Sequence, residues 1–121
     1  MRNIKYSNAA ANKTVALIYV SRVKMNEDNS AISKLYYYEK DDNNKWSDEK
    51  TIDVSNLSKK IFNDEIIAWA GRLDNTNHQF ANVCKIIPMI KDGYLYVTSV
   101  SDEDESNNLE NLPGYVKKWK Y

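Results

Sequence analysis

Residues 79–100 read QFANVCKIIPMIKDGYLYVTSV and are the most informative part of the sequence for the fold. Two apolar segments, Gln79–Ile90 and Tyr94–Val100, are joined by the dipeptide Asp92-Gly93. Asp-Gly suits both central positions of a type I′ turn, whose twist matches that of the flanking strands. The sequence therefore predicts a β-hairpin with a two-residue loop.

The short loop fixes the strand register of this hairpin. Lys91 then faces Tyr94, and Pro88 faces Val97. Antiparallel pairs alternate between hydrogen-bonded and non-bonded, so Pro88 falls at a non-bonded position. Because its missing N–H would point away from the partner strand, we expect an edge or a bulge on the other side of the strand near Pro88.

Three more strands are predicted upstream. Thr14–Lys24 carries apolar side chains on both faces, which is typical of a strand that is covered on both sides. Ile32–Lys40 follows the turn-forming run Asn26–Ser30, and we expect these two strands to form a hairpin. A short apolar strand, Glu65–Ala70, is predicted to end at Gly71.

One short helix is predicted in the middle of the chain. Asp53 is expected to cap its N-terminus by accepting hydrogen bonds from the first turn, and Asn63 to end it. Val54, Leu57 and Ile61 form an apolar stripe at helical spacing. The predicted order is strand, strand, helix, strand, strand, strand, which gives an α+β fold with a mainly antiparallel sheet of about five strands.

Length and composition indicate one small domain. The chain has 121 residues, and we expect a flexible N-terminal arm over residues 1–13 and a single globular domain over 14–121. Lys+Arg and Asp+Glu number 17 each, a balance that disfavours a dedicated nucleic-acid surface. Without a signal sequence or an apolar run of membrane-spanning length, a cytoplasmic protein with no membrane segment is expected. Abundant Asn, Lys and Tyr are typical of an AT-rich bacterial or phage genome.

The pattern of reactive residues predicts no catalytic, metal or cofactor site. His78, the one histidine, lies in a polar turn without a partner nucleophile or carboxylate in the pattern. Cys84, the one cysteine, is expected to be buried and structural. Asp102–Glu105 lacks the glycine and the final glutamate of a calcium-binding loop and is expected to be a solvated acidic run. We therefore expect a protein that is not an enzyme.

Two aromatic features are candidates for binding. Tyr36, Tyr37 and Tyr38 place at least one tyrosine on each face of their strand. Such a run with nearby lysines can stack on single-stranded bases, although strand propensity and core packing explain it without a ligand. The basic, aromatic tail Val116–Tyr121 is expected to fold back onto the acidic run, with contact to an acidic partner as the alternative.

A pattern near the C-terminus resembles a known family. Tyr94-Leu95-Tyr96-Val97-Thr98 is followed by Asp102 and then by Asn107-Asn108-Leu109-Glu110-Asn111-Leu112-Pro113. It is similar to the end of small bacterial proteins classed as domain of unknown function 3892, which carry Tyr-Leu-Arg-Thr, an Asp, and Asp-Asn-Leu-Asp-Asn-Leu-Pro. The resemblance covers roughly residues 15 to 114, and this chain departs from it at Val97 and Asn107. It implies a fold and no activity.

The segment Asn107–Pro113 has two interpretations. Asparagine side chains satisfy backbone groups in turns, and Leu109 and Leu112 can close the open edge of the sheet. The alternative is a recognition loop. The predicted binding residues are accordingly Tyr36, Tyr38, Asn108, Leu109, Asn111, Leu112 and Pro113.

These observations favour a non-catalytic binding or regulatory module that acts through contacts with a protein partner. The alternative is a small-ligand or nucleotide-binding domain, for example one that a phage uses against a host defence system. It predicts a closed pocket near Tyr36–Tyr38 or Trp69. Single-stranded nucleic-acid binding comes third. The sequence leaves open whether the protein is a monomer or a homodimer.

Overall fold

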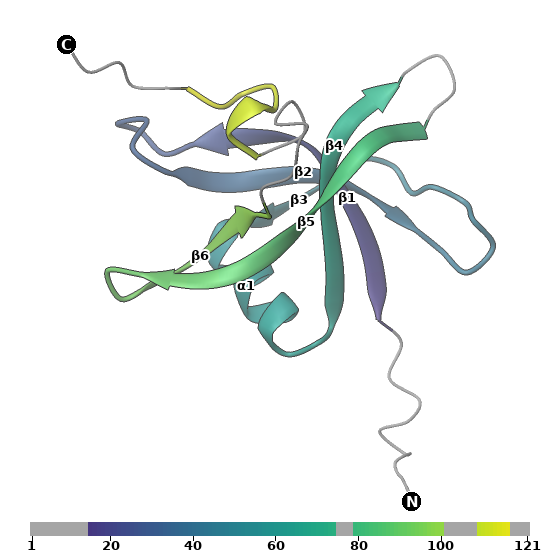
Figure 1. Cartoon of the computed structure of the whole chain (residues 1–121), viewed down its shortest axis with the longest axis horizontal. Coiled ribbons are helices and arrows are strands. Elements are labelled where there is room, and N and C mark those ends of the chain that lie inside the picture. Colours follow the sequence, from purple (N-terminus) through teal and green to yellow (C-terminus); the bar gives the residue numbers. More distant parts are fainter. Residues whose placement is uncertain (1–14, 75–78, 101–108, 117–121) are drawn as a thin grey trace, which may run out of the picture.

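The computed structural model describes residues 15–74, 79–100 and 109–116. Within them lie one sheet, one α-helix and one short 3₁₀ helix (Figure 1). The elements are β1 (Ala16–Met25), β2 (Ile32–Lys40), β3 (Lys50–Asp53), α1 (Val54–Phe62), β4 (Ile66–Asp74), β5 (Gln79–Lys91), β6 (Tyr94–Ser99) and η3 (Leu109–Asn111). The predicted N-terminal arm, His78, Asp102–Glu105, Asn107, Asn108 and the tail beyond Val116 lie outside the described residues.

The strands are arranged in the order β3-β2-β1-β4-β5-β6. Every neighbouring pair is antiparallel except β1 and β4, which run parallel from Ala16–Ile66 to Val20–Ala70. Between these two parallel strands the chain forms β2, β3 and α1. The α+β class with one helix and a mostly antiparallel sheet is thus confirmed, but the described sheet is mixed and has six strands rather than about five. The helix described here is too short and polar to cross a membrane.

Two details of the predicted strands are wrong. β3 was not predicted, because Lys50–Asp53 is only four residues long, mostly exposed, and lacks alternating apolar side chains. β4 does not end at Gly71 but continues to Asp74. The register with β5 shifts between Ala70 and Arg72, so Gly71 lies at a bulge, where glycine is well tolerated.

The hairpin of β5 and β6 has the predicted register. Lys91 pairs with Tyr94 and Pro88 with Val97. Asp92 and Gly93 both have positive φ, 51° and 82°, as a type I′ turn requires. The ladder between β5 and β4 ends at Ile86, so β4 does not pair with β5 at Pro88, and the predicted edge is confirmed.

The helix has the predicted limits, but its cap differs. α1 follows Asp53 and ends before Asn63, with Leu57 buried in the core. The Asp53 carboxylate makes no capping hydrogen bond, contrary to the prediction. Asp53 is also the last residue of β3, where it pairs with Lys34 of β2, and its carboxylate lies 4.0 Å from the Lys34 ammonium. The neighbouring strand therefore competes with the helix for this side chain.

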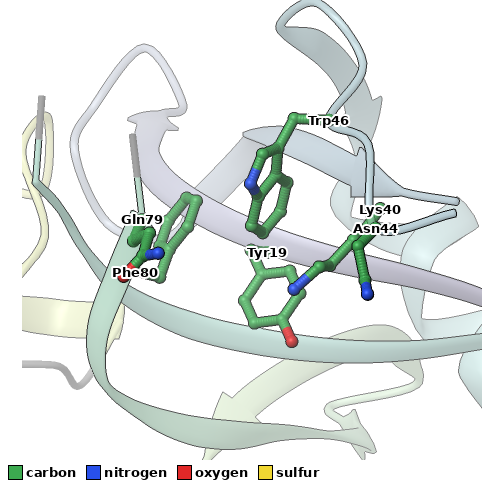
Figure 2. Close-up of a pocket in the computed structure, with 6 residues that line it drawn as sticks. All are labelled: Tyr19, Lys40, Asn44, Trp46, Gln79 and Phe80. Carbon is green, nitrogen blue, oxygen red and sulfur yellow. The ribbon is translucent and has the colours of Figure 1, made fainter. Parts of the chain in front are cut away.

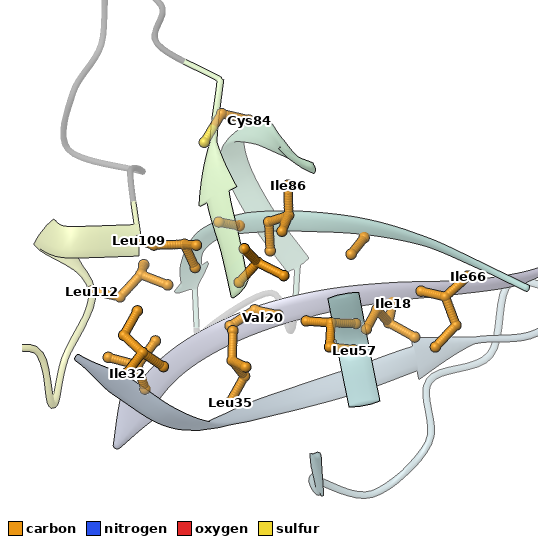
Figure 3. Close-up of a cluster of buried hydrophobic side chains, with 14 of the residues drawn as sticks. Ile18, Val20, Ile32, Leu35, Leu57, Ile66, Cys84, Ile86, Leu109 and Leu112 are labelled. Atoms are coloured by element: carbon orange, nitrogen blue, oxygen red, sulfur yellow. The ribbon is translucent and has the colours of Figure 1, made fainter. Parts of the chain in front are cut away.

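The core lies between one face of the sheet and α1 (Figure 3). Cys84 is buried there, as predicted. Leu109 and Leu112 reach the same cluster from the C-terminal segment, and only 4% and 3% of their surfaces are exposed. The buried apolar residues are Ile18, Val20, Val23, Met25, Ile32, Leu35, Leu57, Ile66, Ala68, Ala70, Cys84, Ile86, Val97, Leu109 and Leu112.

Residues 109–116, the closing segment, lie against the end of β1 (Figure 1). The parallel ladder with β4 stops at Val20, which leaves the later part of this edge of β1 without β4. There the Val23 N–H donates to the Pro113 carbonyl oxygen at 2.9 Å. The Leu109 N–H donates to the Ser99 hydroxyl at 3.2 Å. The segment thus closes the sheet, as the first of its two interpretations expects.

Candidate binding site

The outer face is the side of the sheet opposite the core and α1. Ile18, Val20, Ala68 and Ala70 are buried in the core, so strand alternation places Leu17, Tyr19, Ile67 and Trp69 on the outer face. Tyr19 pairs with Tyr38 on β2 and with Trp69 on β4, which makes a row of aromatic residues across three strands. Ile67 and Ile87, also on this face by alternation, are 41% and 37% exposed. This concentration of apolar side chains is characteristic of interaction surfaces.

Trp46 is held over this face by an ordered turn. The Asp41 carboxylate accepts hydrogen bonds from the backbone N–H groups of Asn43 and Lys45, at 2.8 and 2.9 Å. Asn44 adopts a φ of 62°, a conformation that asparagine tolerates better than most residues. Trp46 then bridges to Lys40 of β2. The turn therefore fixes the backbone that presents the indole ring.

Three aromatic rings enclose one side of a first hollow (Figure 2). The Trp46 ring stands edge-on to Tyr19, with centroids 5.0 Å apart and an interplanar angle of 75°. Phe80 of β5 lies 5.3 Å from Tyr19 and 5.6 Å from Trp46. The hollow measures about 440 Å³ and is lined by Tyr19, Lys40, Asn44, Trp46, Gln79 and Phe80.

Polar groups surround these rings. In the described part of the chain, the side-chain amides of Asn44 and Gln79 and the indole N–H of Trp46 form no hydrogen bond. The Lys40 ammonium lies 5.1 Å from the centroid of the Trp46 ring and forms no ion pair with another described residue. The hollow therefore offers aromatic surface together with available donors and one cation.

A second hollow adjoins the first. It measures about 310 Å³ and is lined by Ser21, Arg22, Tyr38, Glu49, Arg72, Leu73 and Pro113. The Tyr38 ring lies 6.1 Å from Phe80, which lines the first hollow, so these two rings stand between the hollows. Arg72 forms no ion pair within the described ranges.

Arg22 of the second hollow is paired with a carboxylate and lies over an aromatic ring. Its guanidinium donates to the Glu49 carboxylate from Nη2 at 2.8 Å and from Nε at 3.2 Å. It also lies 3.9 Å from the centroid of the Tyr36 ring. The hydrogen bond to Glu49 raises the pKa of Arg22 above its ordinary value, against the lesser opposing effect of desolvation. Arg22 and Glu49 thus largely neutralise each other, and Arg72 is the charged residue of this lining that has no ion-pair partner among the described residues.

The structure does not bring the predicted binding residues together at one site. Tyr38 and Pro113 line the second hollow, and Tyr36 lies beneath Arg22. Leu109 and Leu112 belong to the core, whereas Asn111 is exposed on η3. Asn108 lies outside the described residues. The hollow at Tyr38 is partly open to solvent, unlike the closed pocket that the ligand hypothesis expects.

Sequence reasoning did not find the principal residues of the first hollow. The sequence pattern gives no partner for Tyr19 within the strand predicted over Thr14–Lys24, and Trp46 lies outside every predicted strand and helix. Phe80 begins a strand that lies far from both in the sequence. The alternation of side chains along the strand places Tyr19 on the opposite face from Ile18 and Val20, and this is a signal that the sequence contains. No local pattern indicates that Trp46 and Phe80 meet beside Tyr19.

Another hollow, of about 560 Å³, lies between the turn of the β5–β6 hairpin and the first turn of α1. Lys91, Tyr94 and Tyr96 are among its lining residues, and the Tyr96 hydroxyl accepts a hydrogen bond from the Ile32 N–H at 3.2 Å. It shares no lining residue with the two hollows of the outer face. Its residues therefore serve as controls for those hollows.

Comparison of the chain with family models, with curated proteins and with solved structures finds no match. The resemblance to the domain of unknown function 3892 stays a prediction.

Proposed function

We propose that the protein is a non-catalytic binding module that acts through contacts between its outer face and a partner protein. The observation that carries this proposal is the row of Tyr38, Tyr19 and Trp69 on a face that α1 does not cover, with Trp46 and Phe80 packed beside it. Exposed Ile67 and Ile87 extend the apolar surface beyond these rings.

Physical chemistry favours a protein as the partner. Tryptophan and tyrosine dominate the energetics of protein interfaces, because they bury a large area while losing little side-chain entropy. The Trp46 turn is already ordered by Asp41, so binding costs little further ordering of the backbone. Both hollows are partly open to solvent, which suits side chains that project from a partner.

The test is a comparison of variants with a purified partner. A protein that co-purifies from the native host would be identified by mass spectrometry, produced separately, and titrated by calorimetry against wild type and Trp46→Ala. Loss of this indole is expected to weaken binding about 30-fold, as for a buried interface tryptophan. A cytoplasmic setting, which stays a prediction, is assumed for the capture.

The matched control is Tyr94→Ala. Tyr94 is 75% exposed at the hairpin turn and lines neither outer-face hollow. The Tyr94→Ala substitution is expected to leave the affinity for the purified partner unchanged. Equal loss in both variants, or no loss in Trp46→Ala with retained folding by circular dichroism, would contradict the proposal. Self-association that Trp46→Ala abolishes would instead assign the face to a second copy of this chain.

A small ligand is the second candidate occupant. The first hollow combines aromatic rings with donors that have no partner among the described residues, and its volume of about 440 Å³ falls within the range of small-molecule sites. A nucleotide would stack its base on Trp46 or Phe80 and direct its phosphate toward Lys40. Native mass spectrometry of the freshly purified protein tests this function: an added mass that is lost in Trp46→Ala supports it, and a bare chain argues against it.

A further inference from the structure

We propose that the two hollows together recognise one extended, acidic, proline-containing segment of the partner. This inference rests on the proposed function and names the chemistry of the partner. The Phe80 ring lines the first hollow and the Tyr38 ring the second, and their centroids are only 6.1 Å apart. A chain that crosses these two rings therefore enters both hollows.

The charges of the lining residues call for an acidic segment. Among the described residues that line the first hollow, Lys40 is the only ionisable one other than tyrosine. In the second hollow, Glu49 forms an ion pair with Arg22, and Arg72 has no ion-pair partner among the residues described. Within the described ranges, each hollow thus presents one cation without an ion-pair partner. Two carboxylates along one segment would satisfy both.

The remaining groups favour an extended backbone with prolyl rings. Polyproline II segments have no internal hydrogen bonds, so their carbonyl oxygens are free to accept. The Trp46 indole and the side-chain amides of Asn44 and Gln79 can donate to such carbonyls. The rings of Trp46 and Tyr19, which meet edge-on, line the first hollow, and prolyl rings dock in aromatic-lined grooves.

A single-stranded nucleic acid fits these observations less well. The chain as a whole has no excess of basic residues, at 17 against 17, to offset the charge that every phosphate of such a partner carries.

The experiment is a selection from a displayed library of random peptides of about ten residues, long enough to span both hollows in polyproline II form. Wild-type protein is the bait, and Trp46→Ala removes unrelated binders. Enrichment of proline together with Asp or Glu is the expected result. An enriched peptide, synthesised and titrated, is expected to bind Lys40→Gln/Arg72→Gln about tenfold more weakly than wild type.

Lys59→Gln is the charge control, because Lys59 is exposed on α1 and lines none of these hollows. It is expected to bind the peptide as wild type does. Enrichment without acidic residues, no enrichment above the Trp46→Ala background, or tighter and strongly salt-dependent binding of oligothymidylate would each overturn the inference. If the purified partner still requires Trp46 while the selected peptides lack acidic residues, only the assigned chemistry fails, and the proposed function stands.

Discussion

Gly114 occupies a position in the closing segment that no other residue suits. Its φ is +92°, in the region that side chains with a Cβ rarely adopt. A Cβ built there would lie 1.9 Å from the Val23 carbonyl oxygen, which belongs to the backbone and cannot turn aside. We predict that Gly114→Ala lowers the free energy of unfolding by about 3 kcal/mol, measured by urea denaturation.

Gly93 provides the control for backbone strain alone. Its φ is +82°, but nothing lies within 4 Å of a Cβ built there. Gly93→Ala is expected to cost only about 1 kcal/mol, from the unfavourable φ. Equal losses in the two alanine variants would show that the closing segment does not lie tightly against β1.

Ser58 carries a buried hydroxyl group without a hydrogen-bond partner among the described residues. The residue is 0% exposed in α1, and no hydrogen-bond partner for its Oγ is found among the described residues. We predict that Ser58→Ala leaves the free energy of unfolding unchanged or raises it by about 1 kcal/mol, since an unsatisfied polar group is removed. Ser55→Ala, at an exposed helix position, reports the effect of helix propensity. A marked loss of stability in Ser58→Ala alone would be the contrary result.

At the scale of elements, the closing segment is predicted to respond to alkaline pH. Burial, with smaller effects from Tyr96 and Glu110, raises the pKa of Tyr115 above its ordinary value of 10.0. The neutral phenol thus contributes stability that is fully present below pH 10.0 and is lost as the pH rises through the folded-state pKa. Tyr115→Phe is therefore expected to lose less stability than wild type between about pH 9 and about pH 11. Parallel losses in urea titrations across this range would contradict the assignment.

The sequence predicted those elements whose signals are local. The Asp92-Gly93 turn and the spacing of Val54, Leu57 and Ile61 determine the hairpin and the helix without help from distant residues. β3 has no such signal, because it pairs along β2 with mostly exposed side chains. The predicted capping hydrogen bond of Asp53 is absent for a related reason. Asp53 is also a residue of β3, and this position brings its carboxylate close to the ammonium group of Lys34 on β2.

At the scale of the whole molecule, the candidate site depends on pairings that local sequence does not encode. The parallel contact of β1 with β4 brings Tyr19 beside Trp69, and the pairing of β4 with β5 carries Phe80 toward Tyr19. Residues 19, 46 and 80 meet only when these strands are assembled. The predicted tyrosine run lay next to the site, since Tyr38 pairs with Tyr19, but its partners required the sheet order.

Hydrogen exchange with mass spectrometry, on the free protein and on its complex with the purified partner, tests most directly whether the outer face is the binding surface. Slower exchange is predicted in β1, in residues 40–46 and at the start of β5, with α1 and the β5–β6 turn unchanged. Slower exchange confined to α1 or to the hairpin turn, with residues 40–46 unaffected, would contradict the account and move the binding surface to the opposite side of the molecule.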